Sequence, residues 1–134
     1  MKKLVMDLDD TICTTVKGDY EHSKPNKEVI EKLQKYKKEG FEIVIYSSRN
    51  MRTYEGNVGK INIHTLPTII NWLKTNDVPF DEVIIGKPWC GFEGFCVDDK
   101  SIRNIFNNFH WVFSFLFWLF ADFNGKRGQM GSLA

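Results

Sequence analysis

Short apolar runs alternate with helical patterns along most of the chain. Residues 4–6 ("LVM") and 41–46 ("FEIVIY") are mainly apolar, which is typical of buried strands in a parallel sheet rather than of half-exposed strands. Residues 83–85 and 95–97 are two further short runs, and a glycine or an aspartate follows each of them. We therefore predict a strand at every one of these runs.

Helical spacing marks two of the segments between the runs. Beyond Asn26, apolar residues recur every three or four positions until Gly40, which is a natural helix stop. The second pattern begins at Thr65, a candidate N-cap, and continues to about Asn76. The segments without periodicity are predicted to be loops, and they are residues 14–25 and 49–64.

Strands that alternate with helices predict a parallel sheet, because right-handed crossover connections carry the helices. We expect an α/β fold with a doubly wound sheet and helices on both faces. In such folds ligands bind beyond the carboxyl ends of the strands. The polar side chains that follow the predicted strands should therefore meet at one edge: Asp7, Asp9, Ser47, Lys87, Asp98 and Asp99.

This set of side chains predicts phosphoryl transfer with a divalent cation. Several carboxylates at one edge repel each other unless a cation binds them, and oxygen ligands together with a substrate phosphate are typical of Mg²⁺. One carboxylate can then attack phosphorus while a second transfers a proton. Lys87 and Ser47 can hold the phosphoryl oxygens as negative charge develops on them.

The same residues form a recognisable series of motifs. The series is D-x-D-x-T at residues 7–11, then Ser47, Lys87 and the acidic pair Asp98 and Asp99. In order and spacing it resembles the haloacid dehalogenase superfamily. The resemblance implies a Rossmann-like core, an aspartyl-phosphate on Asp7 and proton transfer by Asp9. It also implies Mg²⁺ bound by Asp7, the Asp9 carbonyl and the acidic pair, and it leaves open which aspartate of the pair ligates the metal directly.

A narrower resemblance covers residues 1–103, which we expect to be the phosphatase core. The segments "SSRNMRTYEGNVGKINIHTLPTIINWL" and "GKPWCGFEGFCVDDKSIR" are similar to small capless phosphatases of bacterial capsule and surface-polysaccharide biosynthesis. This likeness implies a small phosphorylated substrate such as a sugar phosphate. Because one loop and one helix fill the interval between the first two motifs, no substantial cap domain fits there.

The loop at residues 49–64 is the main candidate for substrate recognition. Its cationic side chains can bind an anionic group, arginine through a planar fork and lysine as a point charge. A charged loop can equally be a solvated surface, and Trp89 is either a platform for a sugar ring or a packing residue. The candidate substrate-binding residues are Ser48, Arg49, Arg52, Lys60 and His64.

The composition of the chain indicates which partners and which cellular compartment to expect. The chain has 134 residues, enough for one domain with an ordinary core, and a formal net charge of +1. Such a balanced charge gives no reason to expect nucleic acid or an anionic membrane as a partner. Three cysteines without C-x-x-C spacing, together with an N-terminus that lacks an apolar leader, predict a cytoplasmic protein with reduced thiols.

The C-terminal segment, residues 104–134, departs from this pattern. Its first part is rich in phenylalanine and tryptophan, and Asp122 is the single charged residue among residues 104–124. The uninterrupted apolar run, residues 111–121, is far shorter than the roughly twenty residues of a membrane-spanning helix, so we expect no transmembrane span. A last helix on the sheet, an exposed apolar surface and a divergent chain end are the alternatives. Because aromatic residues occur on all sides of a helical wheel, we expect homo-oligomerisation or aggregation through residues 106–123.

Functions other than hydrolysis remain open as alternatives. A signalling receiver carries its acceptor aspartate after the third strand, whereas Lys87 follows the third predicted strand here. A non-catalytic assembly protein would depend mainly on the aromatic C-terminal segment. Phosphotransfer to an acceptor other than water needs a site closed to water, which the expected lack of a cap disfavours. We therefore expect a Mg²⁺-dependent phosphomonoesterase.

Overall fold

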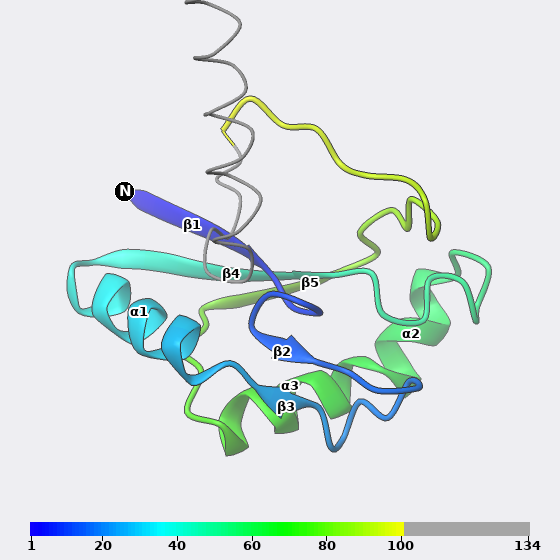
Figure 1. The fold of residues 1–134 in the computed structure, drawn as a ribbon, viewed down its shortest axis with the longest axis horizontal. Coiled ribbons are helices and arrows are strands. Elements are labelled where there is room, and N and C mark those ends of the chain that lie inside the picture. The colour runs from blue at the N-terminus through cyan, green and yellow to red at the C-terminus, as the bar shows by residue number, and fades with distance from the viewer. Residues whose placement is uncertain (101–134) are drawn as a thin grey trace, which may run out of the picture. The chain divides into compact units, whose positions relative to one another are not determined.

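The computed structural model describes residues 1–100 of the chain, and a parallel sheet lies at the centre of residues 1–96 (Figure 1). Its three strands are β1 (Lys2–Asp7), β4 (Phe41–Ser47) and β5 (Glu82–Ile85), with β4 in the middle. Asp7 pairs with Tyr46 and Ser47 pairs with Ile85, so the carboxyl ends of the strands lie at one edge. This confirms the predicted α/β fold with a parallel sheet.

The chain divides into two compact units, Met1–Cys96 and Val97–Ala134, and each is described by itself. The sheet and its helices belong to the first unit. Of the second unit the structure describes residues 97–100, so the expected oligomerisation through residues 106–123 falls outside the described residues. No helix within residues 1–100 is long and apolar enough to span a membrane.

Both predicted helices are confirmed. α1 (Lys27–Lys38) begins after Asn26, whose side-chain oxygen caps the helix. α3 (Leu66–Thr75) begins after Thr65, but the Thr65 hydroxyl does not cap it and instead accepts a hydrogen bond from the Asn50 amide at 2.7 Å. The residue at the start of α3 is thus tied to the loop that follows β4.

The hydrophobic core lies between one face of the sheet and the helices α1 and α3. Ile43 and Ile45 of β4 are fully buried in one cluster with Leu33 of α1 and Leu73 of α3. Figure 1 shows both helices on the same side of the sheet. The opposite face lacks, within residues 1–100, the helical layer that the sequence predicts. Val5 lies on that face and is 55 % exposed, although the apolar run predicts it to be buried.

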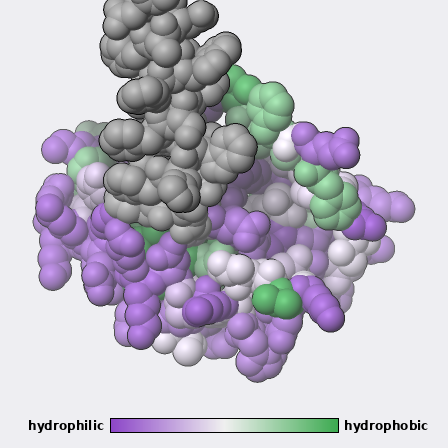
Figure 2. All heavy atoms as spheres, in the orientation of Figure 1, coloured by the Kyte–Doolittle hydropathy of each residue, from purple (hydrophilic) through white to green (hydrophobic). Residues whose placement is uncertain are grey.

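The prediction of a strand at residues 95–97 is wrong. This segment pairs with no strand in the described part of the chain, and Phe95 and Val97 are 82 % and 85 % exposed. A short apolar run between Gly94 and Asp98 does not form a strand without a neighbour that completes its backbone hydrogen bonds. Figure 2 shows small hydrophobic patches on an otherwise mainly hydrophilic face of the molecule.

The second half of the predicted loop at residues 49–64 is a helix, α2 (Val58–His64). Asn57 caps this helix by accepting a hydrogen bond from the backbone N–H of Lys60 at 3.0 Å. Ile61 is the buried residue of the helix, which packs against α3 and touches β5. Without repeated apolar positions, the segment lacks the periodicity by which a sequence predicts a helix.

The other predicted loop, residues 14–25, also contains some regular structure. β2 (Cys13–Thr14) and β3 (Lys24–Pro25) form a short antiparallel pair at its two ends. The backbone N–H of Asn26 donates to the carbonyl of Ile12 at 2.8 Å, which closes the loop just before α1 begins. The loop is therefore fixed at its base, next to the end of β1.

Candidate active site

The turn after β1 presents the first two acidic side chains of the site. Leu8 is fully buried, and its carbonyl accepts a hydrogen bond from the backbone N–H of Cys13 at 3.2 Å. Asp10 has the left-handed backbone conformation, with a φ of +58°, which tightens the turn. Because Leu8 is anchored in the core between them, Asp7 and Asp9 stay partly exposed at the carboxyl edge of the sheet.

Lys87 meets Asp7 across the end of the sheet. The Lys87 ammonium donates to Oδ1 of Asp7 at 2.6 Å, and the two side chains are 22 % and 35 % exposed. The backbone N–H of Lys87 donates to the carbonyl of Ser47 at 3.1 Å, which continues the pairing of β4 with β5. Within residues 1–100, Oδ2 of Asp7 accepts only a long contact of 3.5 Å from the Thr11 hydroxyl. One oxygen of Asp7 therefore pairs with a cation, and the other has capacity for a further ligand.

Gly86 sets the direction in which the chain leaves β5. Its φ is +86°, and a Cβ at this position would lie 3.1 Å from Cγ2 of Val58 in α2. A residue with a side chain would therefore be strained here and would crowd α2. This turn places Lys87 beside the end of β4, from which its side chain reaches Asp7.

The buried side chain of Arg49 holds Asp9. Nε of Arg49 donates to Oδ2 of Asp9 at 2.9 Å, and Nη2 donates to Oδ1 at 2.9 Å, so the pair is bidentate. The Arg49 side chain is 0 % exposed and that of Asp9 is 29 % exposed. The ring of Tyr20 covers the guanidinium, with 4.4 Å between Cζ of Arg49 and the ring centroid. Arg49 thus points inward to a carboxylate of the site.

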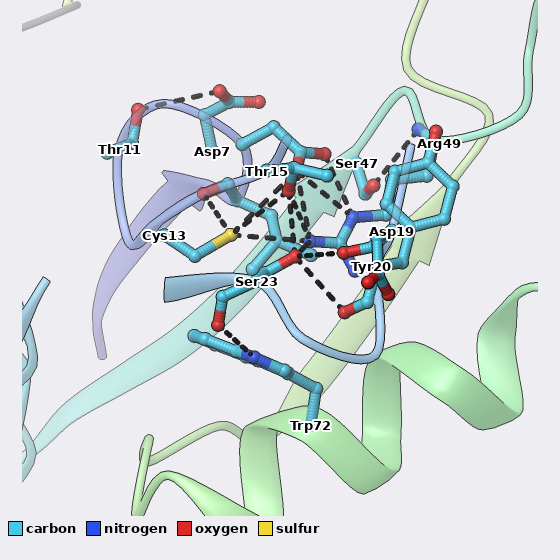
Figure 3. A network of polar contacts seen from close by, with 12 residues as sticks. Asp7, Thr11, Cys13, Thr15, Asp19, Tyr20, Ser23, Ser47, Arg49 and Trp72 are labelled. Carbon is cyan, nitrogen blue, oxygen red and sulfur yellow. Dashed lines mark hydrogen bonds and ion pairs between the residues drawn. The ribbon is translucent and has the colours of Figure 1, made fainter. Parts of the chain in front are cut away.

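Hydroxyl groups from the loop between β2 and β3 complete this arrangement (Figure 3). The Thr15 hydroxyl donates to Oδ1 of Asp9 at 2.8 Å and lies 2.8 Å from the Ser23 hydroxyl. Nη2 of Arg49 lies 3.4 Å from each of the two hydroxyl oxygens. The indole N–H of Trp72 donates to the Ser23 carbonyl at 2.9 Å, so α3 anchors the loop. We call Asp9, Thr15, Ser23 and Arg49 the Asp9 cluster.

The sequence reasoning missed the contributions of Thr15, Tyr20 and Ser23 to this cluster. All of them lie in a polar segment without hydrophobic periodicity. Nothing in their spacing relates them to Arg49, which is more than twenty positions away along the chain. A signal would have been the concentration of small hydroxyl residues that follows the D-x-D-x-T motif.

The thiol of Cys13 borders the Asp9 cluster as a neutral group. Burial raises the pKa of this thiol, and the Asp9 carboxylate raises it further, while the Arg49 guanidinium acts in the opposite direction. The thiol donates to the Leu8 carbonyl at 3.5 Å, and Nη2 of Arg49 lies 3.3 Å from the sulfur. Burial also raises the pKa of Tyr20, with the Asp9 carboxylate as the next cause. Neutral groups therefore surround the Arg49–Asp9 ion pair.

The two serines after β4 have different environments. Ser47 is 1 % exposed, and its hydroxyl accepts a hydrogen bond from the backbone N–H of Arg49 at 3.1 Å. Ser48 is partly exposed, and its carbonyl accepts a hydrogen bond from the backbone N–H of Met51 at 3.1 Å. Ser47 therefore shapes the turn from which the Arg49 side chain points inward.

The remaining cationic candidates lie on the exposed surface. The Arg52 guanidinium lies over the rings of Trp89 and Phe92, at 5.7 Å and 5.4 Å from their centroids. Lys60 and His64 are exposed on α2. Among residues 1–100, the ion pairs of Asp7 and Asp9 are those with Lys87 and Arg49, and none of these surface cations takes part in them.

The acidic pair Asp98 and Asp99 belongs to the second compact unit. The backbone N–H of Lys100 donates to Oδ1 of Asp98 at 2.9 Å, and this bond is the main reason that the pKa of Asp98 is lowered. Within the described residues, no group of three or more histidine, cysteine, aspartate or glutamate side chains is placed to hold a metal ion. The expected position of the acidic pair beside Asp7 stays a prediction.

Comparisons with known proteins bear on this arrangement. A crystal structure of a target protein from Vibrio cholerae matches with a TM-score of 0.75 and 57 % identity, over 77 % of this chain and 84 % of that chain. No curated protein matches the chain in a sequence comparison. The family model described as haloacid dehalogenase-like hydrolase matches residues 4–76, which include Asp7, Asp9 and Ser47. The chain therefore belongs to the haloacid dehalogenase-like hydrolase family.

Proposed function

We propose that the protein is a Mg²⁺-dependent phosphomonoesterase that acts through an aspartyl-phosphate on Asp7. The observation that carries the proposal is the 2.6 Å contact between the Lys87 ammonium and Oδ1 of Asp7, which joins residues 80 positions apart. A carboxylate beside an ammonium at the open edge of a parallel sheet is suited to attack phosphorus. The ammonium can stabilise the negative charge that develops on the phosphoryl oxygens.

The donor chemistry at this edge fits a hard divalent cation. Oδ2 of Asp7 keeps lone-pair capacity, because its contact with Thr11 is long at 3.5 Å. Asp7, the backbone carbonyl of Asp9 and a carboxylate of the pair Asp98 and Asp99 would supply the oxygen ligands that Mg²⁺ prefers. When bound, Mg²⁺ neutralises charge on the phosphate and orients it.

The reaction proceeds in two halves that use the same residues. In the first, an oxygen of Asp7 bonds to phosphorus while the bond from phosphorus to the leaving oxygen breaks, and Asp9 gives that oxygen a proton. In the second, Asp9 accepts a proton from water as the water oxygen attacks the phosphorus on Asp7. Phosphate leaves, and the carboxylate of Asp7 is regenerated. Lys87 stays beside Asp7 and stabilises the phosphoryl charge in both halves.

The substrate class we propose is a small phosphorylated metabolite, and within it a sugar phosphate. Trp89 follows Lys87 closely in the chain and is 43 % exposed, with the Arg52 guanidinium 5.7 Å from its ring centroid. An exposed indole can stack on the apolar face of a sugar ring, and a neighbouring guanidinium can bind an anionic or hydroxyl group. The likeness to capsule-associated phosphatases supports the same class.

Hydrolysis of p-nitrophenyl phosphate, in Mg²⁺ or in EDTA, tests the proposed function. The wild-type protein should be active in Mg²⁺ and inactive in EDTA. Asp7→Asn removes the nucleophile, so kcat should fall by more than about a thousandfold. Asp10→Asn is the matched control, because Asp10 is exposed and asparagine tolerates its left-handed conformation. Equal rates for the wild type and Asp7→Asn would refute the proposal.

A further inference from the structure

We propose that Arg49 is a positioning residue for Asp9, and that it leaves Oδ2 of Asp9 as the oxygen that exchanges the proton in both halves of the reaction. The inference rests on the proposed function. It gives Arg49 a role different from the substrate contact that its place in the loop after β4 predicts. We base it on three observations: the hydrogen bonds of Asp9, the burial of Arg49 and the charge of the Arg49–Asp9 pair.

The two oxygens of the Asp9 carboxylate have unequal hydrogen bonding. Oδ1 accepts from Nη2 of Arg49 at 2.9 Å, from Nε at 3.2 Å and from the Thr15 hydroxyl at 2.8 Å. Oδ2 accepts from Nε alone among the described residues, at 2.9 Å. Because a carboxylate oxygen has two lone pairs, Oδ1 is saturated and Oδ2 retains one. Proton transfer needs a free lone pair within reach of the reacting oxygen, which only Oδ2 offers.

Burial keeps Arg49 from acting as a substrate ligand. Its side chain is 0 % exposed, and the ring of Tyr20 lies 4.4 Å from the guanidinium. Nη2 is already directed to Asp9 and to the hydroxyls of Thr15 and Ser23. Nη1 is buried without a hydrogen-bond partner within residues 1–100. An incoming anion would have to displace Tyr20 to reach this cation.

The charge of the pair fixes the orientation of the carboxylate. A buried guanidinium without a counter-charge is costly, and Asp9 is the acidic side chain that pairs with Arg49. The planar guanidinium fork sets both the position and the rotation of the carboxylate, which a point charge does not. The two oxygens of Asp9 therefore cannot exchange places unless the bidentate pair breaks.

The variants Arg49→Ala and Arg49→Lys test the inference, with Lys38→Ala, at an exposed cation in the last turn of α1, as the control. Activity is measured in Mg²⁺ with p-nitrophenyl phosphate and with an alkyl phosphate. Arg49→Ala should lower kcat by about 10²-fold, the lower end of what general acid–base catalysis contributes, with KM near the wild-type value. The loss in kcat/KM should be larger for the alkyl phosphate, because its leaving oxygen depends more on the proton.

Rescue separates positioning from a general effect on the fold. Guanidinium ion at millimolar concentration should restore part of the kcat of Arg49→Ala, whereas methylammonium should not, because only the former reproduces the fork. Arg49→Lys keeps the charge without the fork, so its kcat should fall while KM is kept. If circular dichroism shows that Arg49→Ala does not fold, the Lys variant carries the same test.

The outcomes that would overturn the inference are distinct from those that would overturn the proposed function. A raised KM with unchanged kcat would show that Arg49 binds substrate. Equal losses on the two substrates without rescue by guanidinium would show a structural role alone. An active wild type whose Arg49→Lys variant keeps full kcat refutes this inference and leaves the proposed function standing. A wild type without phosphatase activity refutes both.

Discussion

Asp7 and Asp9 are two positions apart in the chain, yet their partners place them in opposite environments. Asp7 contacts the ammonium of Lys87, whose side chain is 22 % exposed, whereas Asp9 is held by a guanidinium that is fully buried. A partly exposed ammonium on a flexible stem can follow a phosphoryl group, but a buried planar fork cannot move. The cationic partner therefore decides whether a carboxylate is available for bonding to phosphorus or is fixed in orientation.

Removal of Lys87, the exposed partner of Asp7, should have the largest effect on activity. Lys87→Met should lower kcat/KM by about 10²- to 10³-fold, because the phosphoryl charge loses its stabilising cation. The free energy of unfolding in urea should change by less than about 1 kcal/mol, since the ion pair is partly exposed. Lys38→Met, at an exposed lysine on α1, is the control and should leave both quantities unchanged. A large loss of stability in Lys87→Met would place this pair in the same class as Arg49–Asp9.

Removing the carboxylate of the buried pair should affect both activity and stability. With p-nitrophenyl phosphate, whose leaving oxygen depends little on a proton, Asp9→Ala should slow turnover by about 10²-fold and let phosphorylated Asp7 accumulate, because water is no longer deprotonated. It also leaves Arg49 without its counter-charge, which should cost about 3 kcal/mol in urea unfolding. The mass of the intact protein after acid quenching reports the trapped phosphate. Normal turnover in this variant would contradict the proton-transfer role of Asp9.

The anchor of the Asp9 cluster on α3 should give a smaller effect. Trp72→Phe keeps most of the buried ring but loses the hydrogen bond from the indole N–H to the Ser23 carbonyl, 2.9 Å long. Loss of this bond should lower the free energy of unfolding by about 1 kcal/mol. Trp89→Phe serves as the control, because Trp89 is half exposed and donates no such bond in the described residues. Equal stabilities of the two variants would show that α3 does not hold the loop.

The smallest effect concerns the pH at which the thiols react. The pKa of Cys13 is raised by burial and by Asp9, so the neutral thiol is favoured in the folded protein. The stability that this provides is present below the pKa of the unfolded thiol and is lost as the pH rises through the folded pKa. Alkylation followed by mass spectrometry should therefore label the exposed Cys90 and Cys96 first, and Cys13 only at more alkaline pH. Early labelling of Cys13 would show that the Asp9 cluster opens readily.

The meeting of Asp7 with Lys87 could be predicted from the sequence, because it follows from strand order alone. Apolar runs locate β1, β4 and β5, and parallel strands bring the residues after them to one edge. The backbone hydrogen bond from Lys87 to Ser47 then constrains the direction of the lysine side chain. Hydrophobic patterning therefore predicts those side chains of a site that lie at strand ends.

The partner of Arg49 could not be predicted, because it depends on a loop without periodicity. Thr15 and Ser23 reach Asp9 only after β2 pairs with β3 and Trp72 binds the Ser23 carbonyl. No sequence pattern encodes these contacts, so the position of Arg49 in a charged loop predicts a substrate ligand and does not predict the pair with Asp9. The helix α2 was missed for a related reason, since Ile61 alone marks its buried side.

The glycine between β5 and Lys87 has a consequence for how such a protein can diversify. Gly86 has a positive φ, and a Cβ there would lie 3.1 Å from Cγ2 of Val58, so a substitution would strain the turn before Lys87 and crowd Val58. Trp89 and Phe92, which follow this turn in the chain, are by contrast exposed. Selection for a new substrate can therefore replace these aromatic residues, while the turn at Gly86 keeps Lys87 beside Asp7.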